Sequence, residues 1–206
     1  MGLKPTYVYP DNLSYENNVK TVFNSGNQYR RINTSNLNNR PEQTKTVVMS
    51  KDYYVVTLYA DQKRNLHAYI DDEDLFGEKV IYLERDDRAA ATEADYVMVE
   101  FFLDWFPVMT DQDVYVMGAI TDWNLDEKNK MTYDYERKGY ALNLLLKQGY
   151  YDYIYAVKER GQTTADVGVV AGDFWETQNE YTIYLYLFDP TQNYDQLIGV
   201  KTVLSH

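Results

Sequence analysis

The sequence predicts an all-β protein, and three observations point to that class. The chain of 206 residues contains 22 tyrosines. Its apolar segments consist mainly of Tyr, Val, Ile, Leu and Thr, which are residues that favour strands. Segments with the periodicity of an amphipathic helix are scarce. We therefore expect two β-sandwich domains, since the length is enough for one large domain or two small ones.

Five strands are expected in the first part of the chain. Asparagine-rich turns separate them, because asparagine tolerates left-handed backbone angles and bonds its own backbone. Five strands make a thin sandwich at best, so the sequence leaves open whether upstream strands are missing from this domain. The predicted strands are residues 6–9, 28–33, 45–49, 53–59 and 79–84.

Seven strands are expected in the second part. Turns recur between them at regular intervals, and seven short strands at this spacing are typical of an immunoglobulin-like sandwich. The predicted strands are residues 96–103, 113–118, 131–133, 140–147, 150–157, 181–188 and 198–204.

A short charged segment separates the two parts. Residues 85–95 read RDDRAAATEAD, which contains small and charged residues without a strand pattern. Residues 1–89 hold 12 basic and 13 acidic side chains, whereas residues 90–206 hold 8 and 19. This asymmetry in charge favours two domains. We predict a β-rich domain at residues 1–88, a linker at 89–94 and an immunoglobulin-like sandwich at 95–206.

Composition argues against several kinds of function. The chain has no cysteine, which excludes disulfides and thiolate metal sites, and only two histidines, His67 and His206. Its net charge of -12 argues against nucleic-acid binding, which needs a basic surface. No apolar run approaches the ~20 residues of a membrane-spanning helix.

No catalytic motif is recognisable in the sequence. It contains neither the Gly-x-Ser-x-Gly elbow of serine hydrolases nor a glycine-rich phosphate-binding pattern. Carboxylates are numerous, so their count alone does not exclude a paired-carboxylate hydrolase. We predict a protein that is not an enzyme and that has no catalytic residues, no cofactor and no metal site.

Aromatic and arginine side chains are the best candidates for contacts with a ligand or partner. The three tryptophans lie near predicted loops, where exposed rings bind sugars or proteins. Each ring could equally cap the open end of a sandwich core. Aromatic and arginine residues also anchor many protein interfaces. The candidate contact residues are Trp105, Trp123, Trp175, Tyr29, Arg30 and Arg31.

One turn and one hairpin resemble those of glycogen- and starch-binding modules. The turn runs from Gly118 to Trp123 in a Gly-x-x-x-x-Trp pattern, and the following strands carry a Gly-Tyr-x-x-Tyr pattern that begins at Gly149. The resemblance implies an early-set immunoglobulin-like sandwich for the second domain. In this reading Gly118 ends a strand, Thr121 and Asp122 order the turn, and Gly149 makes the hairpin return.

A broader resemblance covers nearly the whole chain. Residues 95–201 are similar to the C-terminal domain of type IX secretion system plug proteins, through GAITDW at 118–123, MTY at 131–133, LLKQGYY at 145–151 and GVK at 199–201. FNSGNQYRR at 23–31 and YYVVTLY at 53–59 resemble the preceding domain of that family. Family members are about twice as long, so this chain would correspond to their C-terminal portion.

The resemblance to plug proteins implies a role and a location. Such proteins lie in the periplasm beneath the outer-membrane translocon barrel and close its pore through protein–protein contacts. They do not span the membrane, catalyse no reaction and hold no cofactor. The chain shows no signal peptide, which truncation would explain.

Carbohydrate binding is the alternative function. Trp123 matches one sugar-stacking tryptophan of α-glucan-binding modules. Ile154 stands where those modules have a lysine, and Gln162 and Thr163 stand where they have a second tryptophan. Two of three sugar contacts are therefore missing, and the alternative depends on Trp123, with Trp175 as a substitute ring. A structural domain without a specific ligand is a third hypothesis.

Overall fold

The regular secondary structure of the described residues consists almost entirely of strands. The computed structural model describes residues 3–16, 28–38, 40–41, 43–64, 75–84, 94–174, 176–177 and 179–204. Every strand predicted from the sequence has a counterpart there, and the all-β class is confirmed. The chain divides into two compact units, residues 27–172 and a second unit formed by residues 1–26 with 173–206.

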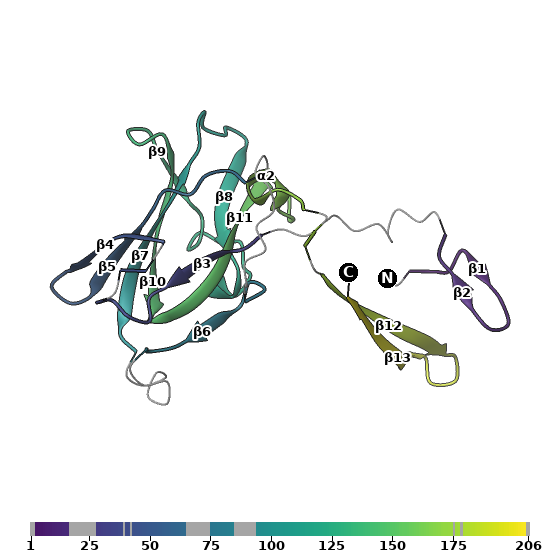
Figure 1. Cartoon of the computed structure of the whole chain (residues 1–206). Coiled ribbons are helices and arrows are strands. Elements are labelled where there is room, and N and C mark those ends of the chain that lie inside the picture. Colours follow the sequence, from purple (N-terminus) through teal and green to yellow (C-terminus); the bar gives the residue numbers. More distant parts are fainter. Residues whose placement is uncertain are drawn as a thin grey trace. The chain divides into compact units, whose positions relative to one another are not determined.

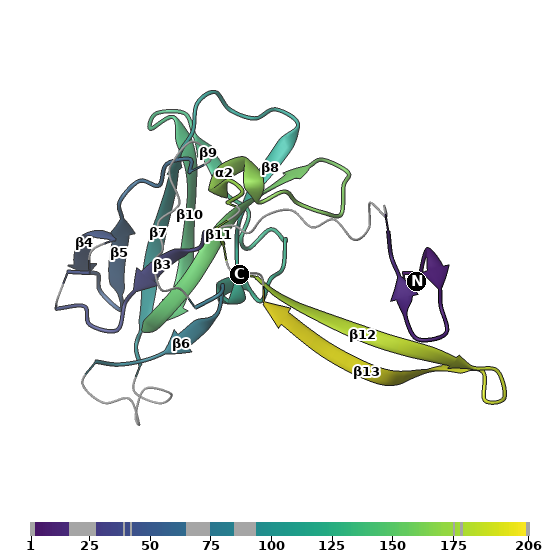
Figure 2. The same ribbon diagram turned by 45° about the vertical axis from the view of Figure 1, so that its right-hand side comes forward.

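Residues 27–172 form a β-sandwich of two sheets (Figures 1 and 2). The first sheet has the strand order β4-β5-β7-β10-β9. These strands are β4 (Thr44–Met49), β5 (Tyr54–Leu58), β7 (Tyr96–Asp104), β9 (Thr132–Asp134) and β10 (Gly139–Lys147). The second sheet is arranged around β11 (Gly149–Glu159), which pairs with β3 (Arg30–Asn33), β6 (Lys79–Ile81) and β8 (Gln112–Met117).

The core lies between these two sheets. Along β7 the side chains alternate strictly, because successive residues of a strand point to opposite faces. Val97, Val99, Phe101 and Leu103 face inward and are fully buried. In β11, by contrast, every residue from Tyr151 to Val157 is buried. β11 is thus the most enclosed strand of the described chain.

Within the described ranges, two short helical segments accompany the sandwich. The 3-10 helix η2 (Ala119–Thr121) follows β8, and α2 (Gly168–Ala171) packs on β11 with Val170 fully buried. Among the described residues, no helix has the length and apolar character needed to cross a membrane.

The predicted division into domains at residues 1–88, 89–94 and 95–206 is wrong. β5 and β7 are parallel neighbours in one sheet, with Tyr54 opposite Val97, although they come from opposite sides of the expected boundary. β3 and β6, both from the first part, pair with β11 from the second. Strand pairing, rather than order along the chain, therefore defines the sandwich. Of the expected linker, residues 89–93 lie outside the described residues, and Ala94 is buried.

Two hairpins make up the described strands of the other unit. β1 (Tyr7–Val8) pairs with β2 (Leu13–Ser14), a short strand that the sequence did not predict. β12 (Glu180–Asp189) pairs with β13 (Tyr194–Leu204) in a long antiparallel ladder. The prediction that these last two strands complete a seven-stranded immunoglobulin-like domain is wrong, because they pair with each other rather than with strands of the sandwich.

Candidate functional site

An exposed group of aromatic rings lies at one corner of the sandwich, and we call it the aromatic corner. It consists of Tyr29 and Trp123, whose rings are in contact, and of Phe76, which precedes the Gly77 that lies against both rings. The Phe76 and Trp123 side chains are 71% and 43% exposed. The rings of Tyr29 and Trp123 meet edge to face, with centroids 6.3 Å apart and planes at 88°. Two of the six predicted contact residues, distant in sequence, are thus brought together.

The turn that presents Trp123 follows from local backbone chemistry. Gly118 has φ of 146°, a conformation that suits glycine, and it ends β8 as predicted. Asp122 and Trp123 both take left-handed angles, and the Trp123 N–H donates to the Gly118 carbonyl at 2.9 Å. The Thr121 hydroxyl donates to the same carbonyl at 3.3 Å. The indole ring therefore extends from a tightly bonded turn.

Gly77 leaves the space that the indole ring occupies. A Cβ atom at this position would lie 2.4 Å from Trp123 Cη2 and 2.7 Å from Tyr29 Cε1. Its φ of 80° also favours glycine. Its carbonyl accepts a hydrogen bond of 2.8 Å from the Ala119 N–H, which joins this loop to η2. One edge of Trp123 is therefore packed against protein while the rest of the ring remains exposed.

Asp152 fastens the loop that carries Phe76 and Gly77 to β11. Its side chain is fully buried, and it accepts from Arg31 Nε at 3.2 Å and from the Leu75 N–H. Its own backbone N–H donates to the Glu78 carbonyl at 3.0 Å. The side chain of Arg31, a predicted partner contact, is 38% exposed. It forms an ion pair with Asp152 that supports the aromatic corner.

Arg30, another predicted partner contact, is buried and belongs to a polar network in the core. Its side chain is only 3% exposed and lies 3.0 Å from Asp61. The hydroxyls of Tyr153 and Tyr155 donate to the other carboxylate oxygen of Asp61 at 2.6 and 2.7 Å. The prediction that Arg30 contacts a partner is wrong, because adjacent strand residues face opposite ways and Arg30 faces the core.

Burial determines the titration of this network. Loss of solvent raises the pKa of Tyr153 and Tyr155 well above the usual value, because the ionised form is poorly solvated there. The negative charge of Asp61 raises both pKa values further. Both hydroxyls therefore stay protonated and continue to donate to Asp61 at neutral pH.

Trp105 is not part of the aromatic corner. Trp105 follows β7, packs partly buried against the core, and has Lys63 Nζ 3.6 Å from its ring centroid. It therefore caps the sandwich core, which is one of the two roles left open by the sequence. Trp175 lies outside the described residues.

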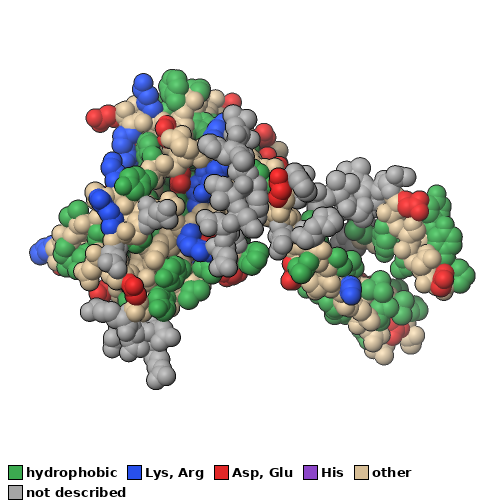
Figure 3. Space-filling model, in the orientation of Figure 1, with side chains coloured by type: hydrophobic (Ala, Val, Ile, Leu, Met, Phe, Trp, Pro, Cys, Tyr) green, Lys and Arg blue, Asp and Glu red, His purple; other side chains and the backbone are tan. Residues whose placement is uncertain are grey.

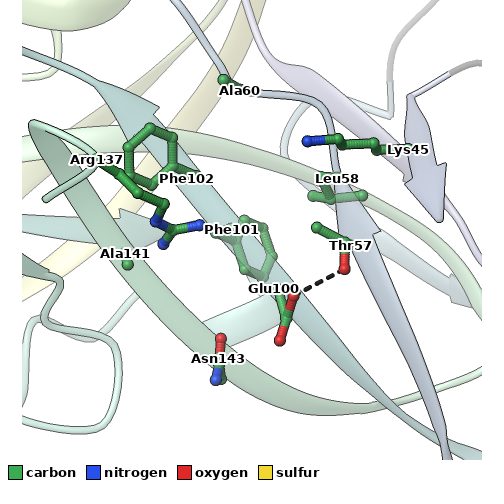
Figure 4. A pocket seen from close by; sticks show the side chains of 10 residues that line it. All are labelled: Lys45, Thr57, Leu58, Ala60, Glu100, Phe101, Phe102, Arg137, Ala141 and Asn143. Atoms are coloured by element: carbon green, nitrogen blue, oxygen red, sulfur yellow. Dashed lines mark hydrogen bonds between the residues drawn. The ribbon is translucent and has the colours of Figure 1, made fainter. Parts of the chain in front are cut away.

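A shallow groove that the sequence did not predict lies on the outer face of the five-stranded sheet (Figure 4). Its volume is about 480 Å³. Arg137 stacks over Phe102 with its guanidinium 4.1 Å from the ring centroid, and Thr57 donates to Glu100 at 2.8 Å. The one carboxylate is therefore already bonded, and the groove lacks the carboxylate pair of a hydrolase. The sequence signal that could have indicated this groove is Glu100, a charged residue in the middle of an otherwise apolar strand.

No metal centre is formed by the part of the chain that the structure describes. In those ranges, His, Asp and Glu side chains do not gather in groups of three or more that could hold an ion.

Comparison with known proteins identifies a structural relative. No family model matches the chain, and no curated protein matches it. The chain is similar to a hypothetical protein from Parabacteroides merdae of known crystal structure, with a TM-score of 0.89 and 36% sequence identity. The match covers 98% of this chain and 51% of that one, so this chain spans about half the length of its relative.

Proposed function

We propose that this chain is a non-catalytic module that binds another protein through the aromatic corner. The observation that carries the proposal is the pair of exposed rings, Phe76 and Trp123, on a turn and a loop that are both held by hydrogen bonds. Aromatic side chains of this kind are enriched at protein interfaces and often dominate the binding energy.

The base beneath the corner supports this function. Asp152 bonds the Phe76 loop to β11, while Gly77 leaves space for Trp123. Because the backbone of the turn and of the loop is held in this way, less of the interaction energy is spent on ordering these segments on binding. Lys79 and Asp122 form an ion pair of 3.0 Å in the same two segments and give the corner a polar rim.

The resemblance described above suggests which partner the module binds. We propose that the chain is part of a type IX secretion plug, located in the periplasm, and that its partner is the outer-membrane translocon barrel. A rigid sandwich supplies the stiffness that a plug needs. Its acidic character, a net charge of -12, would orient the encounter with a complementary surface more than it would set the affinity.

The test is an affinity capture with matched variants. The tagged protein is purified from detergent-solubilised outer membranes of the source organism, and its partners are identified by mass spectrometry. Wild type is expected to recover the translocon barrel. Phe76→Ala and Trp123→Ala are expected to reduce recovery about tenfold or more, as loss of an interface anchor does.

Tyr135→Ala is the control, because the Tyr135 side chain is 77% exposed but follows β9 in the other sheet. An equal loss of barrel recovery in Tyr135→Ala would show that the aromatic corner has no special role in binding. Recovery of no barrel component by wild type would contradict the plug assignment.

Binding of α-glucan is the second candidate function, and Trp123 favours it. The exposed part of its ring offers a stacking surface, and Lys79 and Asp122 could bond sugar hydroxyls. Under this alternative, wild type is retained on a glucan resin and Trp123→Ala is not, whereas Phe76→Ala is retained normally. Absence of retention in wild type removes the alternative.

A further inference from the structure

The β12–β13 hairpin has apolar side chains on both of its faces. Cross-strand partners share a face, so the register assigns each residue to one side. Ile183, Leu185 and Leu187 lie on one face, and they are 58%, 40% and 57% exposed. The other face carries Tyr184, Tyr186 and Phe188, with Val200 and Leu197 opposite the two tyrosines. In Figure 3, apolar side chains are plentiful over these strands.

This pattern differs from that of a strand covered on one side only. An antiparallel sheet with one wet face commonly alternates apolar and polar residues. Strands covered on both faces are instead apolar in a continuous run. The run from Ile183 to Phe188 contains six consecutive apolar or tyrosine residues, all of them exposed. The sequence of the hairpin therefore suits a position between two covering layers.

Strand pairing also leaves the hairpin incomplete. Among the described strands, β12 and β13 pair only with each other. A two-stranded hairpin is marginal in water, and its outer edges offer unpaired backbone groups to further strands. An apolar surface of this extent usually marks an interaction site.

We propose that the β12–β13 hairpin is the seed of a second β-sandwich, completed by strands that this chain does not itself contain. The relative from Parabacteroides merdae indicates their source, because this chain matches 51% of its length and leaves about as many residues again. The occupant is therefore a β-sheet supplied by the other half of a protein of that length. The proposal does not depend on a function for the aromatic corner.

The chemistry of the hairpin specifies the occupant. Between Ile183 and Phe188 there is no charged side chain, and the two charges opposite this run on β13, Lys201 and Asp195, lie at its ends. The covering strands must therefore present mainly apolar and aromatic side chains to both faces, and they extend the ladder at one edge or both.

Hydrogen–deuterium exchange on two proteins tests the proposal. The first is this 206-residue chain, and the second is the full-length Parabacteroides merdae protein, in which the segment aligned with residues 180–204 is followed. We expect these amides to exchange about a hundredfold more slowly in the full-length relative than in this chain, since only there are they enclosed in a cooperative unit. Amides aligned with β11 serve as the internal control and are expected to be protected in both.

Two results would overturn the proposal. One is rapid exchange of the aligned segment in the full-length relative, which would show that its other half leaves the hairpin uncovered. The other is equal protection in the isolated chain. If that protection is lost on dilution and light scattering shows a dimer, a second copy is the occupant rather than strands of a longer protein.

Discussion

The strands β11 and β12 contain similar residues and lie in opposite environments. β11 reads GYYDYIYAVKE and β12 reads EYTIYLYLFD, so both are rich in tyrosine and branched aliphatic residues. All side chains from Tyr151 to Val157 are buried, whereas all those from Thr182 to Phe188 are exposed. Strand formation is thus a local property of both segments, while burial depends on which other strands pair with and cover them.

The same contrast in burial explains why tyrosine hydroxyls of β11 have hydrogen-bond partners within the protein. Its tyrosines lie between two sheets, where each hydroxyl must find a partner, and Asp61 accepts from two of them. In β12, by contrast, Tyr184 and Tyr186 are exposed. Substitution of matched residues in the two regions should therefore have very different effects.

The largest difference in the loss of unfolding free energy between the two regions is expected for phenylalanine substitutions. Phe101 is 1% exposed and packs edge to face on Tyr153, whereas Phe188 is 53% exposed. Phe101→Ala should lower the free energy of unfolding by about 3–5 kcal/mol because it leaves a cavity in the core. Phe188→Ala should change it by less than about 0.5 kcal/mol. Urea denaturation of both variants measures this, and similar losses would mean that the hairpin is packed.

A smaller difference is expected for tyrosine hydroxyls. Tyr155→Phe removes a hydrogen bond of 2.7 Å to the Asp61 carboxylate and should cost about 1.5–3 kcal/mol, the range for bonds to charged groups. Tyr184→Phe, at an exposed position of β12, should be neutral. Thermal unfolding of the two variants distinguishes these outcomes. A neutral Tyr155→Phe would show that the network contributes little.

Alkaline pH should destabilise the protein through the same buried tyrosines. The pKa values of Tyr153 and Tyr155 are raised in the folded state, so their contribution to stability is complete below the unfolded pKa of about 10 and falls as pH rises above it. For two such groups the loss between pH 10 and 11 is about 2 kcal/mol. Urea titrations at several pH values measure the slope. Burial also raises the pKa values of Tyr140 and Tyr151, so in Tyr155→Phe the slope should fall by less than half. An unchanged slope would assign the effect to other groups.

The smallest difference in stability loss between the sandwich and the hairpin is expected for glycine substitutions. Gly77→Ala would place a Cβ 2.4 Å from Trp123 at a φ of 80°, and we expect a loss of about 1–3 kcal/mol together with a shift in tryptophan fluorescence. Gly199→Ala on β13 meets only Leu185 at 3.7 Å, an ordinary contact, and should be tolerated. An unaltered fluorescence spectrum of Gly77→Ala would contradict the packing of the aromatic corner.

The sequence predicts the strands of this protein well because their signals are local. Segments such as residues 96–103 are rich in Val, Phe, Leu and Tyr, and the turns contain Asn and Gly. The short β2 was missed because two residues show no periodicity.

Pairing was not predictable from the same signals. β5 joins β7 across the whole segment between Leu58 and Tyr96, and no local pattern encodes that choice. The charge asymmetry that suggested two domains describes surface side chains, which do not determine which strands pair.

The candidate site was predictable only in part. The sequence predicts Tyr29 and Trp123 as separate contact residues, and they meet because β3 and the turn after β8 flank the same strand, β11. Arg30 was assigned to a partner because arginine is common at interfaces, yet the direction of one side chain on a strand decided otherwise. The role of Gly77 has no local sign in the sequence, since it depends on a ring far away along the chain.

The measurement that tests this account most directly is the unfolding of two fragments. The account predicts that residues 27–172 alone fold cooperatively, with a free energy of unfolding within about 0.5 kcal/mol of the whole chain, because the hairpins add no strand to the sandwich. It also predicts that residues 95–206 do not fold, since they lack β3, β4, β5 and β6. A folded 95–206 fragment, or an unfolded 27–172 fragment, would contradict it.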